Sequence, residues 1–340
     1  MGASSVKAIA GIKTKSGFQV EKMAVIPLPF HSVDERGIIN AEAVAEGIRN
    51  ALAAIGERKP SLATAVRGPG VLTKRVVIPK IPKKEIPDQV RWEAEQVFPV
   101  DISSILVDFI ILGEGANVPG APPGTQGWDL LLVGVRVEDA DILTNLMASM
   151  QAKLTCMDVD AFAVGDFLDG MADIPRNEAV GLVDVGASAT RVSVRHKNNI
   201  VFIREFPWGG NAFTETMGQA LGLSFEDAEA LKIGDGTGIP QEAQEALAGA
   251  YQSWKSELQQ CEDIFVSQDS TSTISRWYLY GGGSQTPGLM DSLQDQRFGD
   301  RVSMLPTHTL FQPKGKVDAG LLHGWSSRLI TAAALTCRKG

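Results

Sequence analysis

The chain has 340 residues, a formal net charge of -8, 44% hydrophobic residues and 21% charged residues. This length suffices for two domains with large cores, and the composition is typical of a soluble globular protein. The acidic balance argues against a nucleic-acid partner, because a phosphate backbone requires a basic surface. Three scattered cysteines without Cys-x-x-Cys spacing argue against a disulfide frame or zinc site and fit a reducing cytoplasm. No apolar run approaches the roughly 18 residues of a membrane span.

The first part of the chain alternates strand and helix patterns. Residues 6–12 and 18–25 predict two strands around a turn at 15–17. Asn40 precedes residues 41–55, whose apolar positions recur with helical spacing, so we expect a helix capped by Asn40. A short strand pattern at 62–66 follows.

The middle of the chain has the pattern of a compact inserted α+β unit. In chain order the expected elements are a strand at 72–78, a helix at 88–97, a strand at 105–112, a flexible Gly- and Pro-rich loop at 113–127, a strand at 129–136 and a helix at 138–153. The entry to this unit is basic at Lys74, Arg75, Lys80, Lys83 and Lys84. A solvated face explains these charges better than a phosphate site, and a partner surface is left open.

The last part of the chain returns to alternating elements. The expected ones are a helix at 161–171, a hairpin at 181–194, a strand at 200–206, a helix through 221 capped by Asn211 or Thr214, helices at 225–232 and 241–268, a strand at 277–280, a helix from 289 and a final helix at 326–338.

The hairpin at 181–194 carries the first functional signal. An apolar run ends in Asp184 and Gly186, and small, hydroxylated residues lead into a second alternating run. A glycine turn can present backbone N–H groups to a phosphate, and a carboxylate at the strand's end can hold Mg²⁺ or its waters. An ordinary structural hairpin is the alternative.

Two further segments add weight to this signal. Residues 1–8 repeat the order of residue types at 185–192, which suggests two similar half-domains that face one cleft. A strand also leads into Gly281-Gly282-Gly283-Ser284, and the helix expected after it would leave bare backbone for a flat base or a phosphate.

This ordered set resembles the actin-like ATPase superfamily. The resemblance implies an α/β fold with two RNase H-like halves around a nucleotide cleft, and ATP with Mg²⁺ as cofactors. The implied phosphate-1 residues are Gly2, Ala3, Ser4, Ser5 and Lys7, the phosphate-2 residues are Asp184, Gly186, Ala187, Ser188 and Thr190, and the adenosine loop is Gly281, Gly282, Gly283 and Ser284. Asp184 would bind the metal through water.

The same resemblance implies roles for residues outside the three loops. Asp158 and Asp160 match the segment where relatives orient the attacking water, and Glu229 and Lys232 match a helix that reaches the ribose and base. An ordinary amphipathic turn is the alternative for that helix. Gly209 and Gly210, in the turn at 207–211, complete the expected nucleotide-binding set.

Within the superfamily, the sequence resembles the PilM family of type IV pilus assembly proteins. The residues that carry this likeness are 2–8, 77–82, 93–99, 181–186 and 229–232. The resemblance implies an inserted subdomain 1C, as in FtsA and PilM. The implied division is subdomain 1A at 1–70, 151–178 and 326–340, 1C at 71–150, 2A at 179–215 and 272–325, and 2B at 216–271.

The family implies a cytoplasmic ATP-binding scaffold of type IV pilus assembly and twitching motility, with at most weak ATPase activity. It would bind the N-terminal cytoplasmic peptide of PilN in a groove between 1A and 1C, and so link the inner-membrane alignment complex to the assembly motor. Its membrane attachment would be peripheral, through these partners, and homo-oligomerisation is left open. The alternatives are an FtsA-like cell-division component, a GspL-like secretion component and a small-molecule kinase.

The beginning of the chain departs from the family pattern. Relatives begin with an apolar strand and Asp-x-Gly, and Met1 stands here at the position of x. We expect a late start of the numbered chain, with a true loss of this metal-side carboxylate as the alternative.

Overall fold

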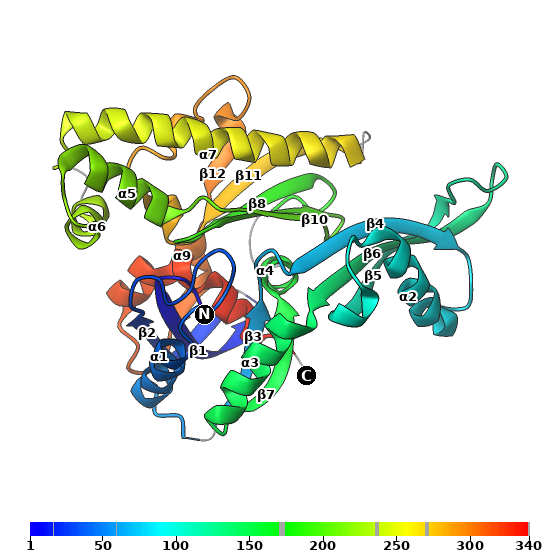
Figure 1. The fold of residues 1–340 in the computed structure, drawn as a ribbon, viewed down its shortest axis with the longest axis horizontal. Coiled ribbons are helices and arrows are strands. Elements are labelled where there is room, and N and C mark those ends of the chain that lie inside the picture. Colours follow the sequence, from blue (N-terminus) through cyan, green and yellow to red (C-terminus); the bar gives the residue numbers. More distant parts are fainter. Residues whose placement is uncertain (16, 59, 170–173, 235–237, 269–271, 339–340) are drawn as a thin grey trace. The chain divides into compact units, whose positions relative to one another are not determined.

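The computed structural model describes residues 1–15, 17–58, 60–169, 174–234, 238–268 and 272–338. The chain divides into two compact units, residues 1–58 with 161–340 and residues 59–160 (Figure 1). The finer division into four subdomains stays a prediction. Each unit is described by itself.

A five-stranded sheet forms the centre of the first unit's second half. Its order is β10-β9-β8-β11-β12, with β8, β9 and β10 antiparallel and β11 parallel to both β8 and β12. The strands are β8 (Ala179–Val185), β9 (Thr190–His196), β10 (Asn199–Phe206), β11 (Ile274–Tyr280) and β12 (Val302–Met304). The hairpin expected at 181–194 is confirmed as the β8–β9 pair.

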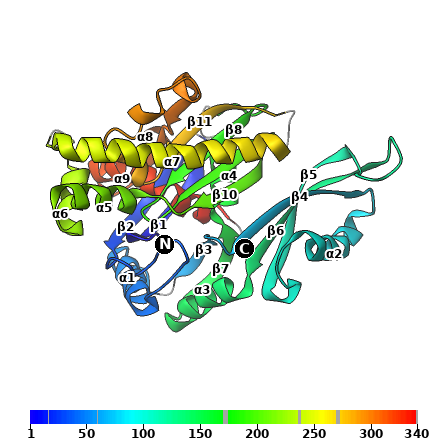
Figure 2. The same ribbon diagram turned by 45° about the horizontal axis from the view of Figure 1, so that its top comes forward.

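Helix α7 (Gln241–Gln268) lies across one face of this sheet, as Figure 1 and Figure 2 both show. It was expected at 241–268 and is confirmed. Its buried face includes Trp254, Leu258 and Phe265, which join one core with alternate residues of the strands. Helices α5 (Gly210–Leu221) and α6 (Phe225–Ile233) precede it, and α5 packs against both α6 and α7.

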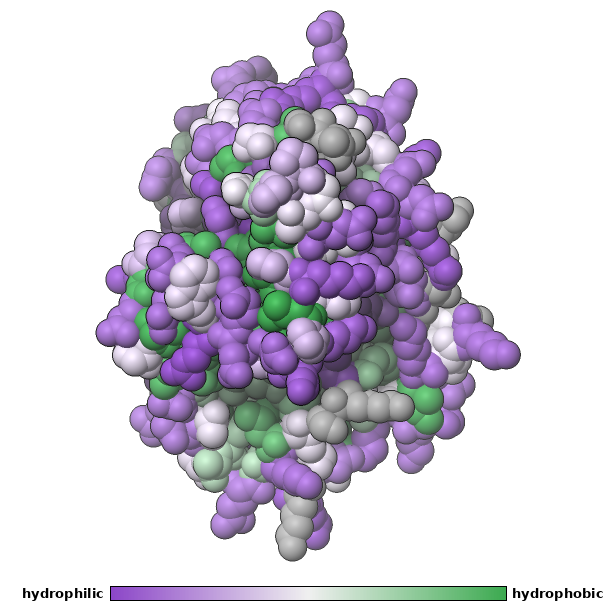
Figure 3. Space-filling view, turned by 90° about the vertical axis from the view of Figure 1, so that its right-hand side faces the viewer, coloured by the Kyte–Doolittle hydropathy of each residue, from purple (hydrophilic) through white to green (hydrophobic). Residues whose placement is uncertain are grey.

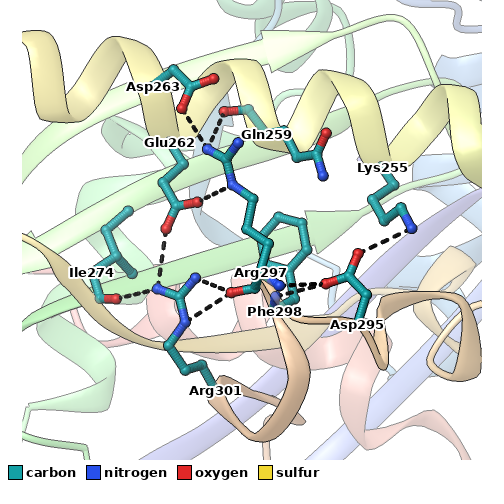
Figure 4. A network of polar contacts seen from close by, with 9 residues as sticks. All are labelled: Lys255, Gln259, Glu262, Asp263, Ile274, Asp295, Arg297, Phe298 and Arg301. Carbon is teal, nitrogen blue, oxygen red and sulfur yellow. Dashed lines mark hydrogen bonds and ion pairs between the residues drawn. The ribbon is translucent and has the colours of Figure 1, made fainter.

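Ion pairs fix the C-terminal part of α7 to the segment that follows β11 (Figure 4). The buried carboxylate of Glu262 accepts hydrogen bonds from Arg297 Nε at 2.7 Å and Arg301 Nη1 at 3.1 Å. Lys255 Nζ lies 3.1 Å from Asp295 Oδ2. Because these contacts join residues far apart in the chain, they hold the helix against the 295–301 segment.

The first half of this unit has a three-stranded sheet of order β1-β2-β13, in which β1 lies at an edge. Its elements are β1 (Ser5–Thr14), β2 (Gly17–Pro27), α1 (Ala41–Ala54), α4 (Asp160–Leu168), α8 (Thr307–Leu310), β13 (Phe311–Pro313) and α9 (Ala319–Thr336). The expected cap of α1 is confirmed, since Asn40 Oδ1 accepts a hydrogen bond from Ala43 N at 3.0 Å.

The second unit contains two sheets. Strands β3 (Ser61–Val66) and β7 (Lys153–Val159) form a parallel pair, and the antiparallel order β4-β6-β5 forms the other sheet. The latter comprises β4 (Val71–Pro79), β5 (Ile105–Asn117) and β6 (Gln126–Arg136), and the helices are α2 (Ile86–Val97) and α3 (Val137–Ser149). Helix α2 buries Ile86, Val90 and Ala94 against this sheet, which agrees with the expected α+β composition.

Several expected local elements are wrong. No α-helix begins at Leu289: Gly288 has φ +83°, and the described residues 283–301 form only short 3₁₀ turns, at Gly283–Gln285, Asp291–Leu293 and Gly299–Arg301. Helix α5 has Gly209 at its N-cap, rather than Asn211 or Thr214.

Other expected boundaries also need correction. Residues 113–117 extend β5 instead of forming a loop, because they pair with β6. The final helix begins at Ala319, where the side chain of Asp318 caps it. The helix expected at 161–171 ends at Leu168, and residues 170 and 171 lie outside the described ones.

Candidate functional site

The β8–β9 turn is closed tightly by its own backbone. Gly186 N donates a hydrogen bond to Ala189 O at 3.0 Å, and Asp184 lies near the end of β8. Ala187 and Ser188 are half-buried in the turn. This is the local geometry that the strand–glycine–strand pattern predicted.

The N-terminus of α5 packs directly onto this turn. Gly210 N donates to Gly186 O at 2.9 Å, and Asn211 N donates to Ala187 O at 2.8 Å. A Cβ atom on Gly209 would lie 2.5 Å from Ala187 O and 2.7 Å from Gly186 O. Glycine at 209 is therefore required by close backbone approach, since both obstructing atoms are main-chain atoms.

The Gly281–Ser284 loop reaches the same turn from β11. Gly281 has φ +90°, and a Cβ there would lie 2.3 Å from Asp184 Oδ1. A Cβ on Gly283 would lie 2.7 Å from Gly186 O. The hydroxyl of Ser284 donates to Gly281 O at 2.8 Å, which closes the loop on itself. The structure thus brings two of the three predicted loops together, with Gly209 and Gly210 between them.

Lys232 is buried beside these glycines. Its Nζ donates to Gly210 O at 2.9 Å and to Thr214 Oγ1 at 2.5 Å, and pairs with Glu229 Oε2 at 2.6 Å. Thr214 also donates to Glu229. Burial lowers the pKa of Lys232, while the carboxylate of Glu229 opposes that shift. Both members of the predicted ribose and base pair therefore lie at the glycine cluster formed by Gly186, Gly209, Gly210 and Gly281–Gly283.

Asp184 is ion-paired with Arg191, which stands opposite it on β9. Arg191 Nη1 lies 3.3 Å from Asp184 Oδ2, and Arg191 Nε lies 2.5 Å from Glu205 Oε2. All three side chains are nearly buried. A metal ion at Asp184 would therefore share this carboxylate with a guanidinium.

Thr190 has a role that its motif did not predict. Its hydroxyl donates to Trp208 O at 2.6 Å and accepts from Trp254 Nε1 at 2.9 Å. Because Trp254 lies on α7, this fully buried hydroxyl connects the hairpin to α7. A direct role of this hydroxyl toward phosphate stays a prediction.

The phosphate-1 residues form a local turn at the start of β1. Gly2 N donates to Ser5 O and Leu28 N donates to Ser4 O, both at 3.0 Å. Gly2 and Ser5 are buried, while Ala3 and Lys7 are half-buried and Ser4 is exposed. Their action on the same nucleotide as the β8–β9 turn stays a prediction.

The two candidate catalytic carboxylates belong to the second unit. Asp158 lies on β7 and accepts a hydrogen bond from Val159 N at 2.7 Å. Asp160 begins α4 and is buried. Their catalytic role stays a prediction.

Two polar residues at the glycine cluster were missed by sequence reasoning. Thr214 was considered only as a cap, and its contact with Lys232 depends on the packing of α5 against α6. Arg328 on α9 lies against Gly282, with its Nε 3.3 Å from the position of a Cβ atom there. The available signal was its place after Ser326 and Ser327 in an otherwise apolar helix.

Comparisons with known proteins agree with this arrangement. A family model described as "Type IV pilus assembly protein PilM" matches residues 1–340. The cell division protein FtsA of Bacillus subtilis (strain 168) is 24% identical over 335 residues, which cover 87% of this chain and 75% of FtsA.

Solved structures show the same fold. A PilM-PilN type IV pilus biogenesis complex matches with a TM-score of 0.79 and 23% identity, over 99% of this chain and 96% of that chain. MreB 5 of Spiroplasma citri bound to AMPPNP matches with a TM-score of 0.50 and 11% identity, over 92% of this chain and 78% of that one. The predicted actin-like ATPase fold is confirmed.

Proposed function

Because this chain belongs to the PilM family of type IV pilus assembly proteins, we propose that it is an ATP-binding scaffold of pilus assembly. The observation that carries the nucleotide part is the meeting of Gly186, Gly209–Gly210 and Gly281–Gly283, where bare backbone lies beside buried Lys232. A glycine surface admits a flat base or phosphates, and a buried ammonium favours an anion. The similar fold of an AMPPNP-bound MreB supports this proposal.

The residues present fit a magnesium ion that arrives with the nucleotide. The described part of the chain has no group of three or more His, Cys, Asp or Glu side chains that could hold a metal ion. A nucleotide-bound Mg²⁺ needs only one or two carboxylates, because phosphates and waters supply the other ligands. We therefore propose that Asp184 holds water molecules bound to the magnesium ion, and that Arg191 competes with the ion for this carboxylate. Bound magnesium would neutralise phosphate charge.

We further propose that the partner is the N-terminal peptide of a PilN protein, bound in a 1A/1C groove. The similarity to a PilM-PilN complex over 99% of this chain supports it. In the second unit, Trp92 on α2 and Leu106 on β5 are exposed by 55% and 54% and offer apolar contact area to a peptide. On the face drawn in Figure 3, hydrophobic side chains form small separate patches among hydrophilic ones.

The proposed place of action is the cytoplasmic side of the inner membrane, reached through partners. None of the described helices has both the length and the hydropathy to cross a membrane. The scaffold role would then need ATP binding more than turnover, so we expect weak ATPase activity at most. An FtsA-like division role is the second candidate, and the 24% identity with FtsA is the observation that favours it.

Calorimetry tests both parts of the proposal. The purified chain should bind Mg-ATP and a PilN-type N-terminal peptide. Gly283→Ala should weaken ATP binding, because its Cβ would meet Gly186 O at 2.7 Å, while peptide binding should persist. Gly324→Ala is the matched control, since nothing lies within 4 Å of its Cβ. A wild-type chain that binds neither ligand would refute the scaffold role, and binding of a division protein instead of PilN would favour the FtsA-like one.

A further inference from the structure

Arg328 is a cation built into the wall of the glycine cluster. It lies on α9, where its Cζ is 4.6 Å from the centre of the Trp325 ring. Its stem passes along Gly282, with Cγ and Cδ each 3.7 Å from the position of a Cβ atom there. The side chain therefore runs between an aromatic ring and the adenosine loop.

The backbone next to Arg328 is hydrogen-bonded to that loop. Gly281 N donates to Ser327 O at 3.2 Å, and the hydroxyl of Ser327 donates to Gly281 O at 3.3 Å. Both groups of Ser327 are thus used to hold α9 against the loop. The position of the guanidinium is consequently set by the same contacts that set Gly281–Gly283.

The charge of Arg328 is poorly compensated. Its Nε is buried and has no hydrogen-bond partner among the described residues, and none of the ion pairs in the described part of the chain includes its guanidinium. The carboxylate of Glu229 attracts the guanidinium electrostatically, but it already forms an ion pair with Lys232 at 2.6 Å. Burial lowers the pKa of Arg328 and only Glu229 opposes that shift. Two cations therefore share one carboxylate.

A partly buried cation without an ion-pair partner is unfavourable unless a ligand supplies the missing charge. The planar guanidinium presents paired N–H donors that suit the oxygen atoms of a phosphate. We propose that Arg328 binds a phosphate group of the nucleotide, so that the site discriminates phosphorylated nucleotides from nucleosides. This proposal rests on the nucleotide-binding function proposed above.

The test compares ATP, ADP and adenosine binding by calorimetry to the full chain and to Arg328→Gln. We expect ATP and ADP affinity to fall by about tenfold to a hundredfold, the range of one charge-assisted contact, with adenosine affinity unchanged. Arg328→Lys keeps the positive charge but not the planar guanidinium, so its ATP and ADP affinities should lie between those of the wild type and Arg328→Gln. Arg49→Gln, an exposed arginine on α1, is the matched control and should bind all three ligands like the wild type.

A thermal melt without ligand separates a ligand role from a structural one. Removal of a poorly compensated cation should leave the melting temperature of Arg328→Gln equal to or above that of the wild type. Unchanged ATP affinity would overturn the proposal, and so would an equal loss of ATP and adenosine affinity, since the guanidinium would then contact the base or ribose. If the wild-type chain bound neither ATP nor adenosine, the proposed nucleotide-binding function itself would be refuted.

Discussion

The contact between α5 and the β8–β9 turn gives a sharp prediction for Gly209→Ala. The new Cβ would start 2.5 Å from Ala187 O, and real Cβ atoms essentially never approach within 3.0 Å. The helix terminus and the turn must therefore separate by about 0.5 Å or more, which is 3.0 minus 2.5. Gly209 has φ -154°, which alanine adopts without strain, so the effect would come from the clash alone.

This separation acts on two backbone hydrogen bonds, Gly210 N to Gly186 O and Asn211 N to Ala187 O. Each contributes about 1 kcal/mol net, so we expect the free energy of unfolding to fall by about 1–2 kcal/mol. We also expect weaker ATP binding, because both partners of the clash line the proposed site. Urea unfolding of the full chain measures the first effect and calorimetry the second.

Hydrogen exchange localises the effect to the two amides. Exchange of Gly210 N–H and Asn211 N–H should speed up by about tenfold, the equivalent of 1.4 kcal/mol. Gly249→Ala is the control with the opposite sign: nothing lies within 4 Å of its Cβ on α7, so it should stabilise by about 0.5–1 kcal/mol. Wild-type stability and exchange in Gly209→Ala would refute the close approach of turn and helix.

Three further changes test separate features. Asp184→Asn should weaken ATP binding in magnesium but not in EDTA, and equal losses in both would deny Asp184 a metal role. Glu262→Gln leaves Arg297 and Arg301 without their shared buried carboxylate, so urea unfolding should show a loss of about 1–2 kcal/mol, discounted because both arginines are about one-third exposed. Burial raises the pKa of the Cys261 thiol to about 12, well above its usual range. The contribution of this thiol to stability is therefore complete below about pH 9 and declines as the pH rises toward 12. A wild-type urea midpoint that falls over this range more than that of Cys261→Ala would agree.

The pattern of apolar residues and glycines correctly predicted those helices and strands that are determined by their local sequence. Helix α7 and the β8–β9 hairpin were placed correctly because each has a continuous apolar face or a glycine turn in its local sequence. The cap by Asn40 was likewise predictable, since its side chain bonds to Ala43 N within the same turn.

Tertiary contacts decided the elements that were missed. Residues 113–117 look like a loop because of their glycines, but pairing with β6 makes them a strand. Gly209 replaces Asn211 as a cap because only glycine fits against Ala187 O.

The same limit applies to the site. The family resemblance predicted the glycines and the two residues Glu229 and Lys232. These two lie only three positions apart in the sequence and form an ion pair. Arg328 could not be placed, because its contact with Gly282 depends on how α9 packs against a loop more than 40 residues earlier in the chain.

Strand β1 is the outermost strand on its side of the three-stranded sheet. Its counterpart in the sequence repeat is β9, which lies between β10 and β8 in the five-stranded sheet. The outward backbone of an edge strand is open to an extended segment from the same chain or another chain. A strand added beside β1 would give the first half a hairpin like that of β8 and β9, and it would cover an edge that could otherwise pair with another chain.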